Sequence, residues 1–323
     1  MVRRALCLVN PKAKTGTAGL ERVRALLAAQ GLSAEVHPTT SLEEGRRLLR
    51  ERGRDADLVV IGGGDGTLSN LAGAILESGK PLGILPMGTA NDLARSLELP
   101  TDLEEAVAII VAGRIAALDV GLLAGDEGAS GRDERPFVNV ATLGLGADVA
   151  RYHRGPRKRW LGVLAYPLSW WDAWRASRPF RLPLTLDGEK RQCRCMQLAV
   201  GCGRHYGGGL TLDETASHFD GLLHLYYVKP QTLTGWLLLL PALFLGRFRR
   251  RREVVTWTGR EAKVVSRRPR TINLDGELAA TTPACFRVRP AALRVFLPEK
   301  TLTEAAAARR ETPAERLTEK EEP

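Results

Sequence analysis

The stretch DLVVIGGGDGTLSNLAG, residues 57–73, combines a strand, a glycine-rich loop and the start of a helix. The apolar run Leu58–Ile61 leads into three glycines, followed by Asp65, Gly66 and Thr67. Glycines let backbone N–H groups approach an anion closely, and the N-terminus of the next helix adds its dipole, so the loop is suited to phosphate. A plain strand-to-helix turn has the same pattern, so the loop alone leaves both interpretations open.

Asp65 restricts the kinds of ligand and reaction that suit this loop. A carboxylate beside a polyphosphate repels it unless a cation lies between the two groups. The loop therefore predicts either Mg²⁺ or a role for Asp65 in proton transfer. A second turn, PMGTAND at residues 86–92, follows the next apolar run and offers further N–H and hydroxyl donors at Gly88 and Thr89. Its Asn91 or Asp92 is expected to cap the helix that follows.

The first third of the chain alternates between two kinds of segment. Short apolar runs lie at residues 5–9, 34–37, 58–61 and 82–85, and helix-compatible segments such as 20–30 and 42–52 lie between them. This alternation predicts βαβ units and a mostly parallel sheet covered on both faces. Ligands of such sheets bind at the carboxyl ends of the strands, so the loops after Val9, His37 and Ile61 are expected to share one edge.

The pattern changes after Val111, where short strand-like runs dominate and favour an antiparallel sandwich. These runs lie at residues 180–186, 196–200, 222–228, 254–258, 262–265, 270–274 and 286–288, with one helix expected around 160–176. We expect a nucleotide-binding α/β domain at residues 1–123 and a β-sandwich domain at 136–289. Residues 299–323 are poor in large apolar side chains and predict a disordered or frayed tail.

Composition limits the class of protein. The 323 residues are 44% hydrophobic and 26% charged, as in a globular protein of about two domains, and the net charge of +10 favours an anionic partner. Five cysteines without a Cys-x-x-Cys pair argue against zinc or disulfides and predict buried free thiols in the cytoplasm. The longest apolar run, Gly235–Gly246, is too short to cross a bilayer.

Several motifs together carry a family resemblance. GGDGT, then PMGTAND, with Asn10-Pro11 after the first strand and Asp275-Gly276-Glu277 near the end, resembles the diacylglycerol kinase catalytic-domain family, most closely its bacterial YegS-like lipid kinases. NAD kinases and phosphofructokinases also contain GGDGT. The combination of GGDGT with PMGTAND and Asp-Gly-Glu is far more specific for the lipid kinase family. The resemblance covers nearly the whole chain apart from the tail.

This resemblance implies an N-terminal phosphofructokinase-like α/β domain and a C-terminal antiparallel β-sandwich, with ATP bound in the cleft between these two domains. It also implies that a last strand, at about 290–298, returns to the first domain. The implied nucleotide contacts are Asn10, Pro11, Lys12, Ala13, Lys14, Thr39 (or Thr40), Gly64, Asp65, Gly66, Thr67, Leu68, Ser69, Asn70 and Thr89. The implied Mg²⁺ ligands of a structural site are Asp220 and the backbone carbonyls of Ser217 and Leu222.

Three carboxylates are the catalytic candidates. Glu277 matches the family's catalytic base, whereas Asp65 and Asp119 match acidic positions near the catalytic Mg²⁺ and the triphosphate. Asp65 is a rival base, and an Asp-Gly-Glu sequence is also an ordinary hairpin turn. The chain departs from the family twice: Ser69-Asn70 stands in place of Asn-Glu, and LDETAS at residues 212–217 replaces Pro-x-Ala.

The expected partner is a lipid presented at a membrane surface, and the expected location is the cytoplasm with peripheral contact to the inner face of the membrane. The apolar segment Trp236–Leu245 followed by Arg247–Arg252, and the basic stretch Arg151–Arg159 before a Trp-rich helix, suit an anionic bilayer. Both segments can equally belong to the core and a solvated surface. A homodimer stays open. Two alternative functions also stay open: an NAD kinase-like enzyme, and a non-catalytic basic protein that binds a membrane or nucleic acid. Nucleic acid is the least favoured partner.

Overall fold

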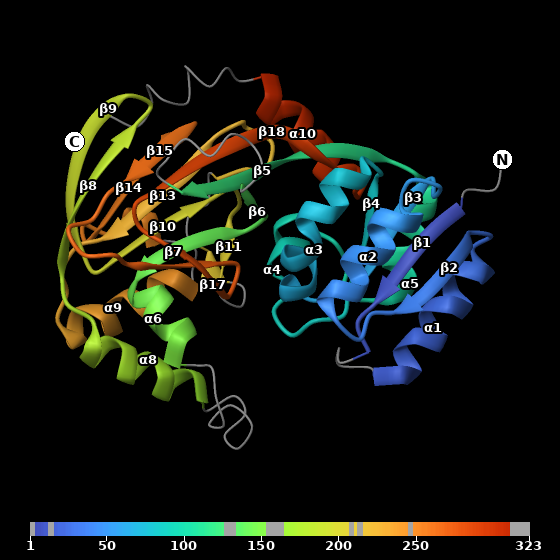
Figure 1. Ribbon diagram of the computed structural model, residues 1–323, viewed down its shortest axis with the longest axis horizontal. Coiled ribbons are helices and arrows are strands. Elements are labelled where there is room, and N and C mark those ends of the chain that lie inside the picture. The colour runs from blue at the N-terminus through green and yellow to red at the C-terminus, as the bar shows by residue number, and fades with distance from the viewer. Residues whose placement is uncertain are drawn as a thin grey trace.

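A computed structural model describes residues 4–11, 16–125, 134–152, 165–206, 210–211, 216–244 and 248–310. Two large sheets and the helices around them form two parts that lie side by side (Figure 1). The helices are α1 (Gly16–Ala29), α2 (Leu42–Arg52), α3 (Asp65–Ser78), α4 (Asp92–Ser96), α5 (Leu103–Ala112), α6 (Leu145–Tyr152), α8 (Ala165–Ala176), α9 (Leu233–Phe244) and α10 (Glu299–Arg310), with a short 3₁₀ helix, η2 (Phe248–Arg250).

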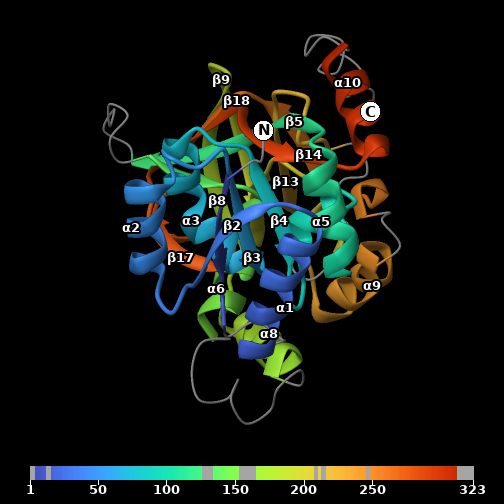
Figure 2. The same cartoon turned by 90° about the vertical axis from the view of Figure 1, so that its right-hand side faces the viewer.

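The first sheet has ten strands and begins as a parallel sheet in the order β2-β1-β3-β4. Its strands are β1 (Arg4–Val9), β2 (Ser33–Pro38), β3 (Leu58–Gly63), β4 (Leu82–Pro86), β5 (Ile115–Gly125), β6 (Arg135–Phe137), β8 (Phe180–Leu186), β9 (Glu189–Cys195), β15 (Glu261–Val264) and β18 (Ala284–Phe296). Helices α2 and α3 cover one face of the parallel strands and α5 the other (Figure 2). The apolar runs of β1, β3 and β4 are therefore strands buried on both faces, as predicted, whereas β2 at the edge of the sheet is partly exposed.

The loops at the carboxyl ends of these strands meet, as expected. The backbone N–H of Thr39 donates to the carbonyl of Val9 at 2.7 Å, and that of Asn10 donates to the carbonyl of Gly62 at 2.8 Å. The loops after β1, β2 and β3 consequently form one edge, the edge at which ligands of parallel sheets bind.

The second sheet is antiparallel throughout, in the order β14-β13-β10-β7-β16-β17. Its strands are β7 (Val140–Gly144), β10 (Gln197–Gly201), β13 (Leu223–Val228), β14 (Val254–Gly259), β16 (Thr271–Leu274) and β17 (Glu277–Thr281), and β11 (His205–Tyr206) pairs separately with β12 (Leu210–Thr211). A shared core holds Leu198 and Leu225 of this sheet with Leu182 and Phe286 of the first sheet. The predicted α/β part followed by an antiparallel sandwich is confirmed.

Two long strands belong to both parts of the molecule. Strand β18 pairs with β5 along its length and with β15 near its start, and at its end Val295 pairs in parallel with Leu82 of β4. Figure 1 shows β5 and β18 crossing from one part to the other. The second half of β18 is thus the segment, at about residues 290–298, in which the chain returns to the first part. Its hydrogen bonds connect the two parts of the molecule.

The C-terminal segment differs from the expected frayed tail over residues 299–310. These residues form α10, whose Thr301 hydroxyl donates to the carbonyl of Leu97 at 3.0 Å and whose Ala305 and Ala308 are buried against the first core. Small residues spaced three and four apart make a buried stripe, which a count of large apolar side chains overlooks. Residues 311–323 lie outside the described part of the chain.

Strand β9, with the sequence EKRQCRC, was also missed. Its exposed positions are mostly charged, and only Cys193 and Cys195 face the core, so the strand has little apolar signal. All five cysteines are free and buried, as predicted. Among the described residues, no helix is both long enough and apolar enough to span a bilayer.

Candidate active site

The glycine-rich loop joins β3 to α3 as predicted, and a second turn packs against it. Helix α3 begins at Asp65, and a Cβ atom added at Gly88 would lie 2.5 Å from the Cα of Gly64. Two backbones can approach this closely only where neither residue has a side chain. The N-terminus of α3 therefore lies directly beside the turn that carries Thr89, where N–H groups and a hydroxyl can meet phosphate.

Asp65 connects these turns to the second part of the molecule. Its Oδ1 accepts the backbone N–H of Leu93 at 3.0 Å and the amide of Asn139 at 3.5 Å. Asn91, expected to cap α4, instead folds back onto Gly88, accepting that residue's N–H and donating to its carbonyl. The side chain that accepts a backbone N–H at the start of α4 is thus that of Asp65, from a different loop. The expectation of a cap from the Asn91 side chain was wrong.

A cavity of about 690 Å³ opens at this edge of the sheet. It is lined by Asn10, Thr39, Thr40, Ser41, Leu42, Gly64, Asp65, Gly66, Thr67, Asn70, Leu71, Met87, Gly88, Thr89 and Glu277. Most of the expected nucleotide contacts are in this set. Leu68 lies in the core instead, Ser69 faces a neighbouring cavity, and Lys12, Ala13 and Lys14 lie outside the described residues.

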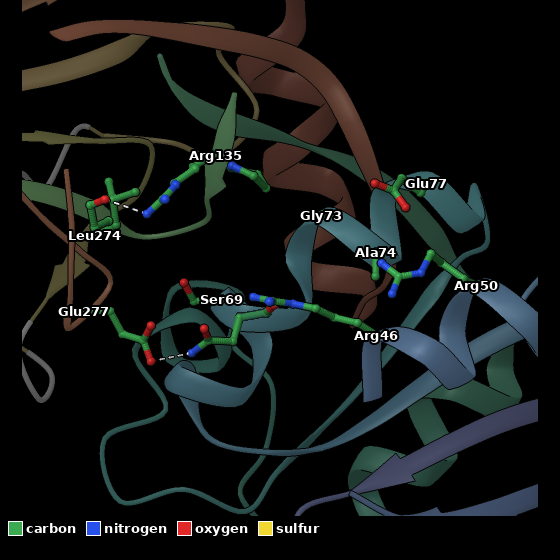
Figure 3. A pocket seen from close by; sticks show the side chains of 12 residues that line it. Arg46, Arg50, Ser69, Gly73, Ala74, Glu77, Arg135, Leu274 and Glu277 are labelled. Carbon is green, nitrogen blue, oxygen red and sulfur yellow. Dashed lines mark hydrogen bonds between the residues drawn. The ribbon is translucent and has the colours of Figure 1, made fainter. Parts of the chain in front are cut away.

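Glu277 reaches this cavity from the second sheet. It is the first residue of β17 and follows a tight turn in which Asp275 and Gly276 have positive φ values of 46° and 98°. Its Oε1 accepts a hydrogen bond of 2.7 Å from the Nδ2 of Asn70 on α3 (Figure 3). Residues 207 positions apart are thereby joined across the boundary between the two parts.

Asp275 anchors the turn before Glu277. Its carboxylate accepts the backbone N–H groups of Val138, Asn139 and Val140 at 2.7 to 3.0 Å, and it also accepts the hydroxyl of Ser69. Burial raises the pKa of Asp275, an effect that these hydrogen bonds oppose. The turn is therefore fixed to β7 on one side and to α3 on the other.

A second cavity, of about 440 Å³, lies on the other side of Asn70 and Glu277 (Figure 3). Three arginines line it: Arg46 and Arg50 from α2, and Arg135 from β6. Arg46 donates to the backbone carbonyl of Asn70 at 3.1 Å, and Arg135 donates to that of Ala279. With Glu77 and Glu277 as its acidic lining residues, this cavity is rich in positive charge and suits a polar or anionic group.

Asp119 lies apart from Asp65 and Glu277. Its two carboxylate oxygens accept the backbone N–H groups of Ala291, at 2.8 Å, and of Gly221, at 2.6 Å, and it lines neither cavity. Burial raises its pKa. Ala291 lies in the irregularity of β18 between Arg289 and Leu293, so Asp119 holds the point where the shared strands β5 and β18 lose register. Of the three carboxylates, the structure brings only Asp65 and Glu277 to one cavity.

The expected structural Mg²⁺ site has a different arrangement. Asp220 accepts the N–H of Leu222 on Oδ1, at 3.0 Å, and its Oδ2 lies 2.9 Å from the Nε2 of His224, with both side chains buried. The Ser217 hydroxyl accepts the N–H of Phe219. Within the described ranges, no group of three acidic, histidine or cysteine side chains could hold a metal. Both oxygens of Asp220 are thus already hydrogen-bonded, to Leu222 and to His224, and the structural Mg²⁺ site, with backbone carbonyls of Ser217 and Leu222 as its other ligands, stays a prediction.

Asn139 and Asp275 were not among the predicted site residues. Asn139 contacts Asp65, and Asp275 holds the backbone of Asn139. Asp275 could have been found as part of the Asp-Gly-Glu motif. For Asn139 the sequence carries no signal, since its partner lies 74 residues earlier in the chain.

Comparisons with known proteins agree with this geometry. Residues 4–123 match the model of the diacylglycerol kinase catalytic domain, and residues 139–297 match the YegS C-terminal NAD kinase beta sandwich-like domain. A protein of Klebsiella pneumoniae named as a YegS-like lipid kinase is 31% identical over 84% of this chain and 89% of its own length. A diacylglycerol kinase of Mycobacterium tuberculosis is 36% identical over 76% of this chain and 78% of its own.

Two crystal structures from Bacillus anthracis share the fold. One has a TM-score of 0.78 at 23% identity and covers 93% of this chain and 96% of its own. The other, a diacylglycerol kinase, has a TM-score of 0.71 at 20% identity and covers 92% of this chain and 98% of its own. The two relatives above 30% identity, together with the two family models, which between them match most of the chain, show that the protein belongs to the diacylglycerol kinase catalytic-domain family of lipid kinases.

Proposed function

We propose that this lipid kinase transfers the terminal phosphoryl group of ATP to the hydroxyl of a diacylglycerol-like lipid, with Glu277 as the general base. One observation carries the proposal: Asp65 beside the N-terminus of α3 and Glu277 of β17 line the same cavity. Phosphoryl transfer needs an anchored polyphosphate and a carboxylate near the attacking hydroxyl, and the two parts of the molecule each supply one of these.

The residues of the first part are suited to hold the nucleotide. The N–H groups at the start of α3 and at Thr89 provide donors for phosphate oxygens, and Asn10 and Thr67, which both line the cavity, are joined by a hydrogen bond of 3.0 Å. Asp65 is the other carboxylate at this cavity and fits a Mg²⁺ ion that takes an acidic ligand besides the phosphates. When bound, Mg²⁺ neutralises charge on the phosphates.

Glu277 is better placed than Asp65 to take the proton of the acceptor. Asp65 is engaged by Leu93 and Asn139 and contributes to the loop's own structure. Glu277 is exposed at the cavity and accepts a hydrogen bond from a neutral amide on one oxygen. A general base needs a lone pair free to meet the acceptor hydroxyl, and the described contacts leave one on Glu277.

The acceptor is a lipid with a free hydroxyl. Diacylglycerol is the default acceptor, whereas phosphatidylglycerol and ceramide-like lipids have equally suitable hydroxyls. The experiment is a panel of these lipids in mixed micelles with labelled ATP, with the phosphorylated product identified by mass. We expect a phosphorylated lipid that depends on both ATP and Mg²⁺. Phosphorylation of NAD in place of every lipid would overturn the assignment in favour of an NAD kinase-like activity.

A second feature supports delivery of the lipid from a membrane. Helices α8 and α9 lie at one end of the second sheet (Figure 1) and are joined by Trp170 and Trp236, whose rings are 6.1 Å apart. The large side chains left exposed on them are Leu168, Trp171, Leu237 and Leu238, of which Leu238 is 66% exposed. Exposed basic side chains lie at the ends of these helices and nearby, at Arg151, Arg175, Arg178 and Arg252. We define these eight side chains as the helical face.

The helical face differs from the segments that the sequence suggested. Trp236 is buried and belongs to the core, whereas its neighbours Leu237 and Leu238 are exposed. Arg247 and most of the stretch Arg151–Arg159 lie outside the described residues. Leucines and a tryptophan flanked by arginines match the interface of an anionic bilayer, where each basic residue contributes about 1 kcal/mol.

Vesicle flotation tests this face. The double variant Leu237→Glu/Leu238→Glu is expected to float poorly with vesicles that contain phosphatidylglycerol at low salt, because it places two acidic groups against an anionic surface. Val265→Glu is the matched control, since Val265 is an equally exposed apolar residue just after β15. Equal flotation of the double variant and the control would exclude the helical face as the membrane contact.

A further inference from the structure

Two neighbouring residues of α3 hold the turn that carries Glu277. Ser69 donates its hydroxyl to Asp275, and Asn70 donates its amide to Glu277 at 2.7 Å. Asp275 and Glu277 are the two acidic residues of a single turn in the second part of the molecule. Ser69 and Asn70 also form one of the two places at which this chain departs from the family pattern, the one in the first part of the molecule. The departures in the first part thus lie opposite the acidic turn of the second.

The orientation of the Asn70 amide follows from its partners. Nδ2 has two hydrogens, and two acceptors are available: the carbonyl of Gly66 at 2.8 Å and the Oε1 of Glu277 at 2.7 Å. Rotating the amide by 180° would place Oδ1 against both acceptors, so only one orientation satisfies them. The amide therefore joins Glu277 to the backbone of the phosphate-binding loop itself.

A carboxylate at position 70 would act in the opposite way. An Asp or Glu oxygen near the Oε1 of Glu277 would repel it, because neither group has a hydrogen to donate when ionised. The backbone of Asn70 is held independently by Arg46, which donates to its carbonyl at 3.1 Å. Replacing the Asn70 side chain consequently changes the contact with Glu277 without removing the helix from its place.

We propose that Ser69 and Asn70 are positioning residues that fix the acidic turn 275–277 against α3, with Asn70 setting the place of the Glu277 carboxylate. This inference rests on the proposed role of Glu277 as the general base. Its consequence is that the helix whose N-terminus faces the phosphates also holds the base. The distance between the reacting phosphate and the base is then determined by one rigid element rather than by how two domains happen to close.

The other charged groups around Glu277 are compatible with this role. Arg46 and Arg50 of α2, Arg135 of β6 and Glu77 of α3 line the neighbouring cavity, and Asp65 lines the larger one. None of the hydrogen bonds described for these five groups is made to Glu277. The Asn70 amide is therefore the feature that we test.

The experiment is a double-mutant cycle with Asn70→Ala, Glu277→Ala and the combined variant, read by turnover of labelled ATP into lipid and by calorimetric binding of Mg²⁺–ADP. Asn70→Ala is expected to lower kcat about tenfold, while the Kd for ADP changes less than about twofold. In the Glu277→Ala background the same substitution is expected to have no further effect, because the group through which it acts is gone. Glu51→Gln on α2, an exposed acidic side chain that lines neither cavity, is the control and is expected to keep wild-type kcat.

The outcomes separate this inference from the proposed function. Wild-type turnover by a folded Glu277→Ala protein would overturn the base assignment itself. A slow Glu277→Ala enzyme beside a fully active Asn70→Ala enzyme would overturn the positioning role alone. An equal loss from Asn70→Ala in both backgrounds would also overturn it, since Asn70 would then act on the nucleotide. If Asn70→Ala unfolds, the isosteric Asn70→Asp takes its place and is expected to lose more kcat than the alanine variant would.

Discussion

Two groups of carboxylates in this molecule look alike in the sequence and differ in three dimensions. Asp65 and Glu277 line an open cavity, where at least one oxygen of each can meet a ligand. Asp119 and Asp220 are buried, and both oxygens of each are engaged by backbone N–H groups or by His224. The role of a carboxylate therefore depends on which hydrogen bonds its oxygens already accept. We therefore treat the first pair as chemical groups and the second as structural ones.

The largest effect is expected at Glu277. Glu277→Gln keeps the shape of the side chain and removes its basicity, so turnover is expected to fall about 10²-fold or more. The melting temperature is expected to stay within a degree or two of wild type, because the carboxylate is exposed. Paired kinetic and thermal measurements check this, and an enzyme that is both active and folded would remove Glu277 from the chemistry.

Asp119→Asn should show the reverse. An amide has one acceptor oxygen where the carboxylate has two, so the N–H of either Ala291 or Gly221 would lose its partner in the protein interior. We expect a loss of about 1–3 kcal/mol in the free energy of unfolding, measured with urea, and near-normal turnover of the folded enzyme. A variant that is fully stable yet inactive would place Asp119 with the chemical groups instead.

The pH dependence of stability provides a finer test at Asp275. Burial raises its pKa above the ordinary 3.8, so between these two values the folded state binds more protons than the unfolded state. The contribution of Asp275 to the free energy of unfolding is then fully present below the ordinary pKa and falls as the pH rises through the raised pKa. Asp275→Asn removes this contribution, so denaturation at several pH values should show a smaller decline than in wild type as the pH rises from 3.8 through the raised pKa. An unchanged slope would contradict the raised pKa.

The smallest effect on stability is expected from metal removal. EDTA is expected to abolish turnover, because the nucleotide needs Mg²⁺, but to leave the melting temperature of the apo enzyme unchanged, because Leu222 and His224 already hydrogen-bond both oxygens of Asp220. Differential scanning calorimetry with and without EDTA, with added Mg²⁺ as the control, checks this. A clear drop in melting temperature that Mg²⁺ reverses would show that a structural ion is held after all.

Much of the fold could be predicted because its signals are local. The strand Phe180–Leu186 and the helix Leu42–Arg52 have the bounds that the sequence predicts. The glycine-rich loop was recognised because a strand, glycines and a helix start follow one another within a few residues. Helix α10 and strand β9 were missed because their buried residues are alanines, a threonine and cysteines, which contribute little to a hydrophobic pattern.

The sequence by itself determined the family, the two kinds of sheet and the carboxylates worth considering, since these depend on residue types and spacings along the chain. Which of these carboxylates lie at the same cavity depends on the tertiary structure. Asp65 and Glu277 meet at one cavity, and Asp119 instead holds the irregularity in β18. The physical reason is that a hydrogen bond depends on distance in space: Asn70 and Glu277 are 207 residues apart in sequence and 2.7 Å apart in the fold.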